Sequence, residues 1–196
     1  LSCDSLSSIL RDDLGQYLMM LIRKRNNPSV VIQGVLSIFG SLFVTMGPVL
    51  RVLIECFMKH VYLKALHQSL GILRDAAVGM QAIHAGNDLP HSPRELQNDK
   101  KQTSGSRSYT LSELETICES LEDLVSDQGF LPTLFLSFDC DSGKTDVVQP
   151  LIRYLSLCVR HTLTLPDRTE VLYLRNLSSS CMTCYSQVLA TLSKRC

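Results

Sequence analysis

The feature that most constrains the fold is a long stretch without any charged residue. Residues 26–50 contain no Asp, Glu, Lys or Arg and include the run VVIQGVLSIFGSLFVTMGPVL. A stretch of this length is long enough to cross a bilayer as a helix. Polar residues nevertheless recur every four positions and form one stripe along such a helix: Gln33, Ser37, Ser41 and Thr45. We therefore predict a helix inside a stack of helices, with neighbours on most of its sides, and not a membrane span.

The rest of the chain shows the spacing of amphipathic helices. Apolar residues recur at intervals of three and four positions, and no segment shows the alternation that is typical of strands. The sequence predicts an all-α protein, an armadillo/HEAT-like helical solenoid segment of about seven helices. The predicted helices are Asp4–Arg25, Ser29–Met46, a bent helix from Pro48 past Leu66, Thr110–Ser126, Phe130–Phe138, Asp146–His161 and Pro166–Lys194.

The composition changes between two parts of this helical pattern. The segment GNDLPHSPRELQNDKKQTSGSRS, residues 86–108, has almost no apolar residues and includes two prolines. Such a segment has no apolar face to bury, so we expect a disordered polar loop. Helical pattern resumes where Thr110 and Glu113 have the spacing of a capping box. The expected organisation is a helical stack over residues 1–85, the loop over 86–108, and a second stack over 109–196 that continues the first.

Charge and cysteine content exclude several classes of protein. The chain has 19 basic and 19 acidic residues, so it lacks the basic excess of a nucleic-acid-binding protein. Its eight cysteines mostly lie within apolar helical patterns, which favours reduced, buried thiols over a disulfide scaffold. Cys181 and Cys184 have the spacing of half a zinc site, but no second pair accompanies them. We predict no metal site, no cofactor and no catalytic residue.

The stretch FDCDSGKTDVV, residues 138–148, resembles the end of a phosphate-binding loop. That loop requires a glycine five residues before its Gly-Lys pair, and the residue at that position is Phe138. The acidic side chains of Asp139 and Asp141 would also repel phosphate. Carboxylates next to helix ends accept hydrogen bonds from free backbone N–H groups. We therefore predict that Asp139 and Asp141 fix the junction between two buried helices.

The same residues carry a resemblance to a known family. The segment FLSFDCD, residues 135–141, resembles the Asn-Tyr-Asp-Cys-Asp box of large Arf guanine-nucleotide exchange factors, which lies upstream of their catalytic domain. The order of the flanking apolar helices is also similar, so the resemblance covers about residues 8–162. Here Ser137 replaces Asn and Phe138 replaces Tyr. These differences point to a divergent paralogue of the brefeldin-A-inhibited type of exchange factor, with the third paralogue as the candidate. The resemblance marks a structural or interaction box: Ser137, Phe138, Asp139, Cys140 and Asp141.

The resemblance implies a function that the residue pattern alone does not give. It implies a non-catalytic regulatory module that supports dimerisation, membrane recruitment and control of an exchange domain elsewhere in the parent protein. The implied partners are other domains of the same polypeptide, a second copy of this chain, and an Arf-family GTPase through the parent protein. The implied location is cytoplasmic and peripheral, on Golgi, trans-Golgi, endosomal or secretory-granule membranes. The alternative interpretation is a generic armadillo/HEAT scaffold in another pathway.

Overall fold

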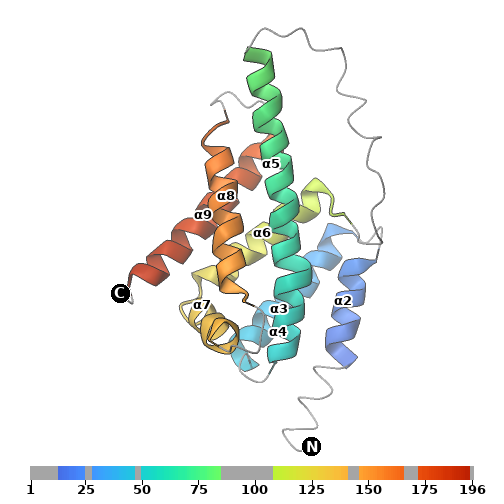
Figure 1. Ribbon diagram of the computed structural model, residues 1–196. Helices are drawn as coiled ribbons and strands as arrows, with labels where there is room; N and C mark the ends of the chain where they lie inside the picture. Colours follow the sequence, from blue (N-terminus) through green and yellow to red (C-terminus); the bar gives the residue numbers. More distant parts are fainter. Residues whose placement is uncertain are drawn as a thin grey trace, which may run out of the picture.

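The chain forms a stack of helices in two layers (Figure 1). The computed structural model describes residues 13–24, 28–46, 50–84, 108–140, 146–165 and 172–194. No strand occurs within these ranges, and their helices join into seven continuous helical segments, as the sequence predicts. The predicted loop lies outside the described residues except for Ser108, as do Asp141 and the predicted start of the first helix. The helices are α2 (Gly15–Arg23), α3 (Ser29–Met46), α4 (Arg51–Phe57), α5 (Leu63–His84), α6 (Leu111–Ser126), α7 (Phe130–Leu134), α8 (Val148–Thr162) and α9 (Leu172–Ser193).

Two of these helices continue without a break through a wider, π-helical turn. The segment η2 (Met58–Tyr62) joins α4 to α5, in the part of the chain where the sequence predicts a bent helix. The segment η3 (Phe135–Asp139) prolongs α7 and contains most of the acidic box. A π-helical turn inserts an extra residue per turn and so rotates the side chains that follow it, and such turns are frequent at functional sites.

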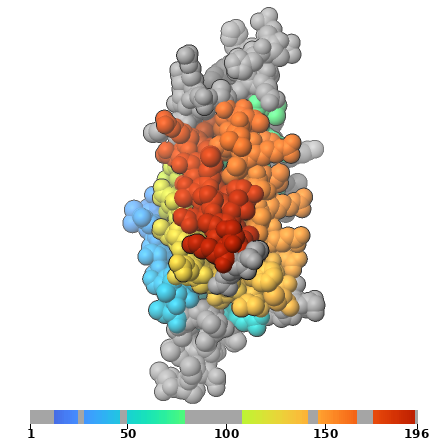
Figure 2. All heavy atoms as spheres, turned by 90° about the vertical axis from the view of Figure 1, so that its left-hand side faces the viewer, coloured from blue at the N-terminus to red at the C-terminus, as the bar shows by residue number. Residues whose placement is uncertain are grey.

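Successive pairs of helices build the two layers. One layer contains α3, α6 and α9, and α6 packs against both of the others. The second layer contains α5 and α8, which lie side by side, and α8 also packs against α9 (Figure 1). Each helical hairpin therefore adds one helix to each layer, which is the arrangement of an α-solenoid. Figure 2 shows α6 between α3 and α9 on one side of the molecule.

The core joins helices from both sides of the polar segment. Phe39 of α3 stacks on Phe57 of α4, with ring centroids 4.2 Å apart and the rings nearly parallel. Phe43 packs against Phe130 of α7 at 4.8 Å. All four rings are at most 5% exposed. Aromatic pairs in such contact add to the stability that their buried area provides.

Side-chain hydrogen bonds fix the point where the chain re-enters the stack before α6. The Gln68 amide of α5 pairs with the backbone of Tyr109: its Nε2 donates to the carbonyl at 2.6 Å, and its Oε1 accepts from the N–H at 2.9 Å. The predicted capping box is confirmed next to it. Thr110 Oγ1 accepts from the Glu113 N–H at 3.3 Å, and Glu113 Oε2 accepts from the Thr110 N–H at 2.7 Å.

The uncharged stretch forms α3 with the predicted bounds, Ser29–Met46, but its surroundings differ from the prediction. The helix lies at the edge of its layer, and its side chains Val30, Ile38 and Val44 are 72%, 45% and 65% exposed. The residue pattern indicated an apolar helix but not how many neighbours cover it. None of the helices within the described residues has both the length and the apolar character to cross a bilayer.

Candidate functional site

The acidic box lies at the junction between α7 and α8. Its segment begins with the short helix α7, whose Phe130, Leu131 and Leu134 are buried and anchor it to the stack. The chain then continues through the π-helical turn η3. The Cys140 N–H donates to the carbonyl of Phe135, five residues earlier, at 3.0 Å, which closes that wide turn. The box is therefore held on a rigid element on its N-terminal side.

Asp139 joins this element to the first turn of α8. Its Oδ1 accepts from the backbone N–H groups of Val147 and Val148 at 2.9 and 3.0 Å, and its Oδ2 accepts from that of Gln149 at 3.1 Å. The first N–H groups of a helix have no partner within the helix, and the N-terminus also attracts negative charge. One carboxylate thus caps a helix that begins nine residues later.

The neighbours of Asp139 attach the box to the core. Phe138 is 1% exposed and belongs to the hydrophobic core. The main-chain carbonyl of Ser137 accepts a hydrogen bond from the guanidinium of Arg51, at the start of α4. Because this contact uses the backbone of Ser137, it does not depend on the serine side chain that replaces the family's asparagine. Ser137, Phe138 and Asp139 thus connect α4, α7 and α8.

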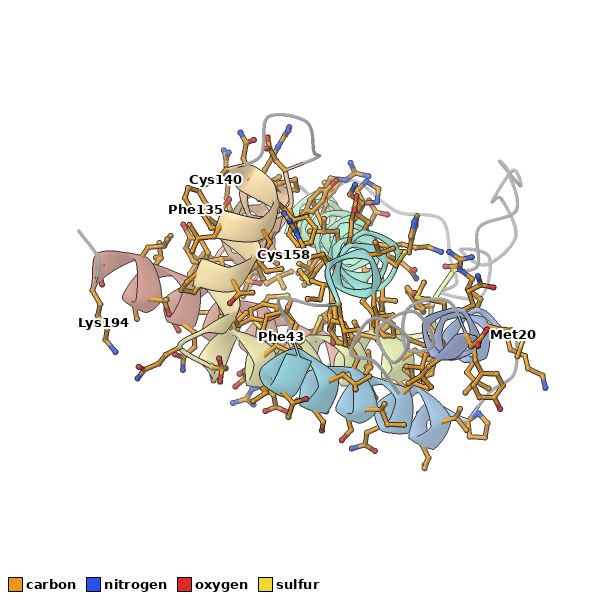
Figure 3. All side chains as sticks on the ribbon, turned by 90° about the horizontal axis from the view of Figure 1, so that it is seen from below. Met20, Phe43, Phe135, Cys140, Cys158 and Lys194 are labelled. Atoms are coloured by element: carbon orange, nitrogen blue, oxygen red, sulfur yellow. The ribbon has the colours of Figure 1, made fainter. Side chains whose placement is uncertain are left out.

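The same turn exposes several side chains. Phe135 and Leu136 are 50% and 68% exposed, and Cys140 is also at the surface. Figure 3 shows Phe135 and Cys140 on the same short helix, whereas Cys158 lies among the helices. The turn that carries the box therefore has a buried side, which holds the junction, and an exposed apolar side.

Four of the cysteines are free and buried, as the sequence predicts, but their grouping into one cluster was not predicted. Cys118 of α6, Cys158 of α8, and Cys181 and Cys184 of α9 come together where these helices meet, and all are at most 1% exposed. The Cys184 thiol donates to the carbonyl of Cys118 at 3.8 Å, and the Cys158 thiol donates to the carbonyl of Leu66 at 3.9 Å. All four are free cysteines.

The environment keeps three of these thiols protonated. The pKa of Cys118 is raised well above its ordinary value by its hydrogen bond to Cys181 and by burial. Contact with Cys118 lowers the pKa of Cys181, but contact with Cys158 and burial outweigh that effect and raise it. Burial also raises the pKa of Cys184. A protonated, buried cysteine packs as a small apolar side chain.

The other predicted features have simple places in the structure. Cys181 and Cys184 share the buried face of α9, as their spacing on a helix requires. Within the described residues no group of three or more His, Cys, Asp or Glu side chains has the arrangement of a metal site. The Gly143-Lys144-Thr145 segment lies outside those residues.

Comparison with known proteins identifies the family. The model of the HUS domain of Mon2/Sec7/BIG1-like proteins matches residues 1–147, three-quarters of the chain, including the box and all helices before α8. No curated protein matches the chain. No solved structure matches it either. The resemblance of the chain to the N-terminal region of large Arf exchange factors is therefore confirmed at the level of the family. The chain belongs to the HUS domains of Mon2/Sec7/BIG1-like proteins.

Proposed function

We propose that the chain is a non-catalytic regulatory and interaction module of a large Arf guanine-nucleotide exchange factor. The observation that carries this proposal is the match of the HUS-domain model over residues 1–147. In the proposed role the module supports dimerisation, recruits the parent protein to membranes and controls its exchange domain in vesicle trafficking. The narrower assignment to the brefeldin-A-inhibited type, third paralogue, stays a prediction.

The arrangement of the helices supports a role in binding and not only in packing. An α-solenoid offers long surfaces on its two layers, and such surfaces are suited to contacts with other domains. The turn η3 adds exposed apolar side chains, Phe135 and Leu136, directly before the box, and Asp139 fixes the position of this turn against α8. Exposed apolar groups on a rigid turn lose little conformational entropy when a partner covers them. We propose that the exposed side of the box, with Ser137 to Asp141 as its frame, contacts another domain of the same polypeptide or a second copy of the chain.

The proposed location follows from the same family. We propose a cytoplasmic protein that associates peripherally with Golgi, trans-Golgi, endosomal or secretory-granule membranes. The GTPase of the Arf family is a partner of the parent protein through its exchange domain, and not of this chain directly.

Three measurements on the purified chain test these parts separately. Titration calorimetry with the exchange domain of the parent polypeptide is expected to show binding, and sedimentation equilibrium to show a dimer. Co-sedimentation with vesicles of Golgi-like lipid composition is expected to recover the chain with the vesicles. Leu136→Ser removes an exposed apolar side chain directly before the box and is expected to weaken this binding. Leu163→Ser changes a similarly exposed side chain at the end of α8 and is the control, expected to leave the binding unchanged. The proposal is wrong if the chain binds neither the exchange domain, nor itself, nor vesicles.

A further inference from the structure

A groove runs between α3 and α6. It has a volume of about 620 Å³ and is lined by residues of these two helices and the turn that follows α6. One wall is the polar stripe of α3: Gln33, Ser37, Ser41 and Thr45. The sequence pattern indicated this stripe but not what faces it.

The opposite wall carries negative charge at regular intervals. Glu119, Asp123 and Asp127 line it at successive four-residue steps, so their carboxylates follow one edge of α6 and its C-terminal turn. By the helical rise this edge is about 12 Å long. Among the residues that the structure describes, those lining the groove include no Lys, Arg or His. Among the described residues, Lys59 forms a salt bridge with Glu55 and Arg74 forms one with Asp75, both away from this wall.

The carboxylates on this edge affect the pKa of a neighbouring carboxyl group, that of Glu122. Burial, together with the nearby charges of Asp123 and Glu119, raises the pKa of Glu122. The whole of α6 contains five acidic residues, Glu113 included, and no basic one. A cationic partner would relieve the repulsion among these carboxylates.

The floor of the groove is apolar and has room for a side chain. Leu36 and Leu124 lie at its base, and Gly40 brings α3 close to α6, where an added Cβ would meet Leu124 at 3.6 Å. Val44 lines the groove and is 65% exposed. An apolar floor beside one charged edge matches an amphipathic helix that carries its apolar and charged residues on adjacent faces.

From this geometry we propose that the groove binds an amphipathic helix of a protein partner, whose Lys or Arg side chains recur every four residues. The apolar face of that helix covers Val44 and the floor, and its cations pair with Glu119, Asp123 and Asp127. An anionic membrane is not the occupant, since the carboxylates repel its headgroups. The proposal rests on the role of the chain as an interaction module, and it names the surface and the chemistry of one partner.

The test uses the whole chain and a designed probe. The probe is a fluorescent helical peptide of about 14 residues, roughly 21 Å long, with Lys at four-residue spacing next to a Leu and Ala face. Two comparison peptides have the same composition in scrambled order and the same apolar face with Glu in place of Lys. Fluorescence anisotropy is expected to show binding of the basic amphipathic probe, weaker binding of the scrambled peptide and none of the acidic one.

Variants of the chain locate the binding. The double variant Glu119→Gln/Asp123→Asn is expected to weaken the affinity about three- to tenfold, since two rim charges are lost. Asp75→Asn removes an exposed carboxylate of α5 outside the groove, and it is expected to leave the affinity unchanged. The charge-reversed variant Glu119→Lys/Asp123→Lys is expected to bind the acidic peptide in place of the basic one, a gain that misfolding cannot produce.

Three results would each overturn the proposal. The first is equal binding of the ordered and scrambled basic peptides, which would mean general charge attraction. The second is an equal loss of affinity in Asp75→Asn, and the third is preference for anionic vesicles over the probe. Binding of the exchange domain to the chain is measured separately by titration calorimetry. If it persists while the probe fails to bind, the groove proposal is wrong and the proposed function stands.

Discussion

Replacing Asp139 by alanine is expected to destabilise the chain more than any other change to an exposed or half-buried residue of the box. The substitution removes the acceptor of three backbone N–H groups, on Val147, Val148 and Gln149. Val147 and Val148 are 0% and 4% exposed, so water reaches their backbone less readily than that of Gln149, which is exposed. The expected loss of stability therefore has two sources: the helix loses its cap, and at least one buried N–H group is left without a partner.

These two contributions set the magnitude. A lost N-terminal cap costs about 0.5–2 kcal/mol. A buried donor left without a partner costs about 1–3 kcal/mol. Together they give an expected loss in the free energy of unfolding of about 1.5–5 kcal/mol for Asp139→Ala. Asp139→Asn keeps one oxygen acceptor for the two buried donors and loses the charge at the helix N-terminus, which is worth about 0.3–1 kcal/mol. We therefore expect Asp139→Asn to lower the free energy of unfolding by about 1 kcal/mol.

Urea denaturation followed by far-ultraviolet circular dichroism measures these differences, because the structure is helical in its described parts. The expected order of stability is wild type, Asp139→Asn, Asp139→Ala. The control is Asp146→Ala, which removes an exposed carboxylate from the same junction and is expected to change stability by less than about 0.5 kcal/mol. Equal midpoints for wild type and Asp139→Ala would refute the capping role, as would an equally large loss in Asp146→Ala.

Three further predictions concern the core and the helix ends. Thr110→Ala removes one half of the capping box and is expected to cost about 0.5–2 kcal/mol in urea denaturation, and no loss would count against the box. Phe57→Ala removes the fully buried ring that stacks on Phe39 and is expected to lower the free energy of unfolding by about 3–5 kcal/mol. Val52→Ala, at a half-exposed site, is expected to change it by close to zero. Burial raises the pKa of Cys184, so above about pH 8.5 the unfolded thiol ionises and the folded one does not. Stability is then lost as pH rises, by up to about 1.4 kcal/mol per pH unit for this thiol, and a pH series on Cys184→Ala that keeps the wild-type slope would contradict this.

Local signals made much of the fold predictable. The bounds of α3 follow from Pro28 before it and Gly47-Pro48 after it, and the capping box placed the start of α6. The family resemblance depended on a short box whose residues are adjacent in sequence. Such features need only neighbouring residues, and they were therefore visible in the sequence.

Features that depend on packing between distant segments were not predictable. The box indicated capping by Asp139, but not that its carboxylate reaches three N–H groups across the intervening loop. The thiol cluster needs α6, α8 and α9 to meet, and each cysteine alone looks like a small apolar residue. The groove needs the polar stripe of α3 to lie opposite the acidic edge of α6. The sequence shows the acidic box, the cysteines and the polar stripe of α3, but it does not show which residues the fold brings next to them.

The rate of nucleotide exchange shows most directly whether this chain controls an exchange domain without catalysing exchange itself. Release of a fluorescent nucleotide from an Arf-family GTPase is followed with three proteins: this chain alone, the exchange domain of the parent polypeptide alone, and the two joined as in the parent. In the proposed role, the chain alone causes no release above background. The joined protein is expected to show a different rate from that of the exchange domain alone, and Asp139→Ala, which loosens the box, is expected to return part of the way to the rate of the exchange domain alone. Exchange catalysed by the chain alone, or identical rates with and without it, would show that the proposed role is wrong.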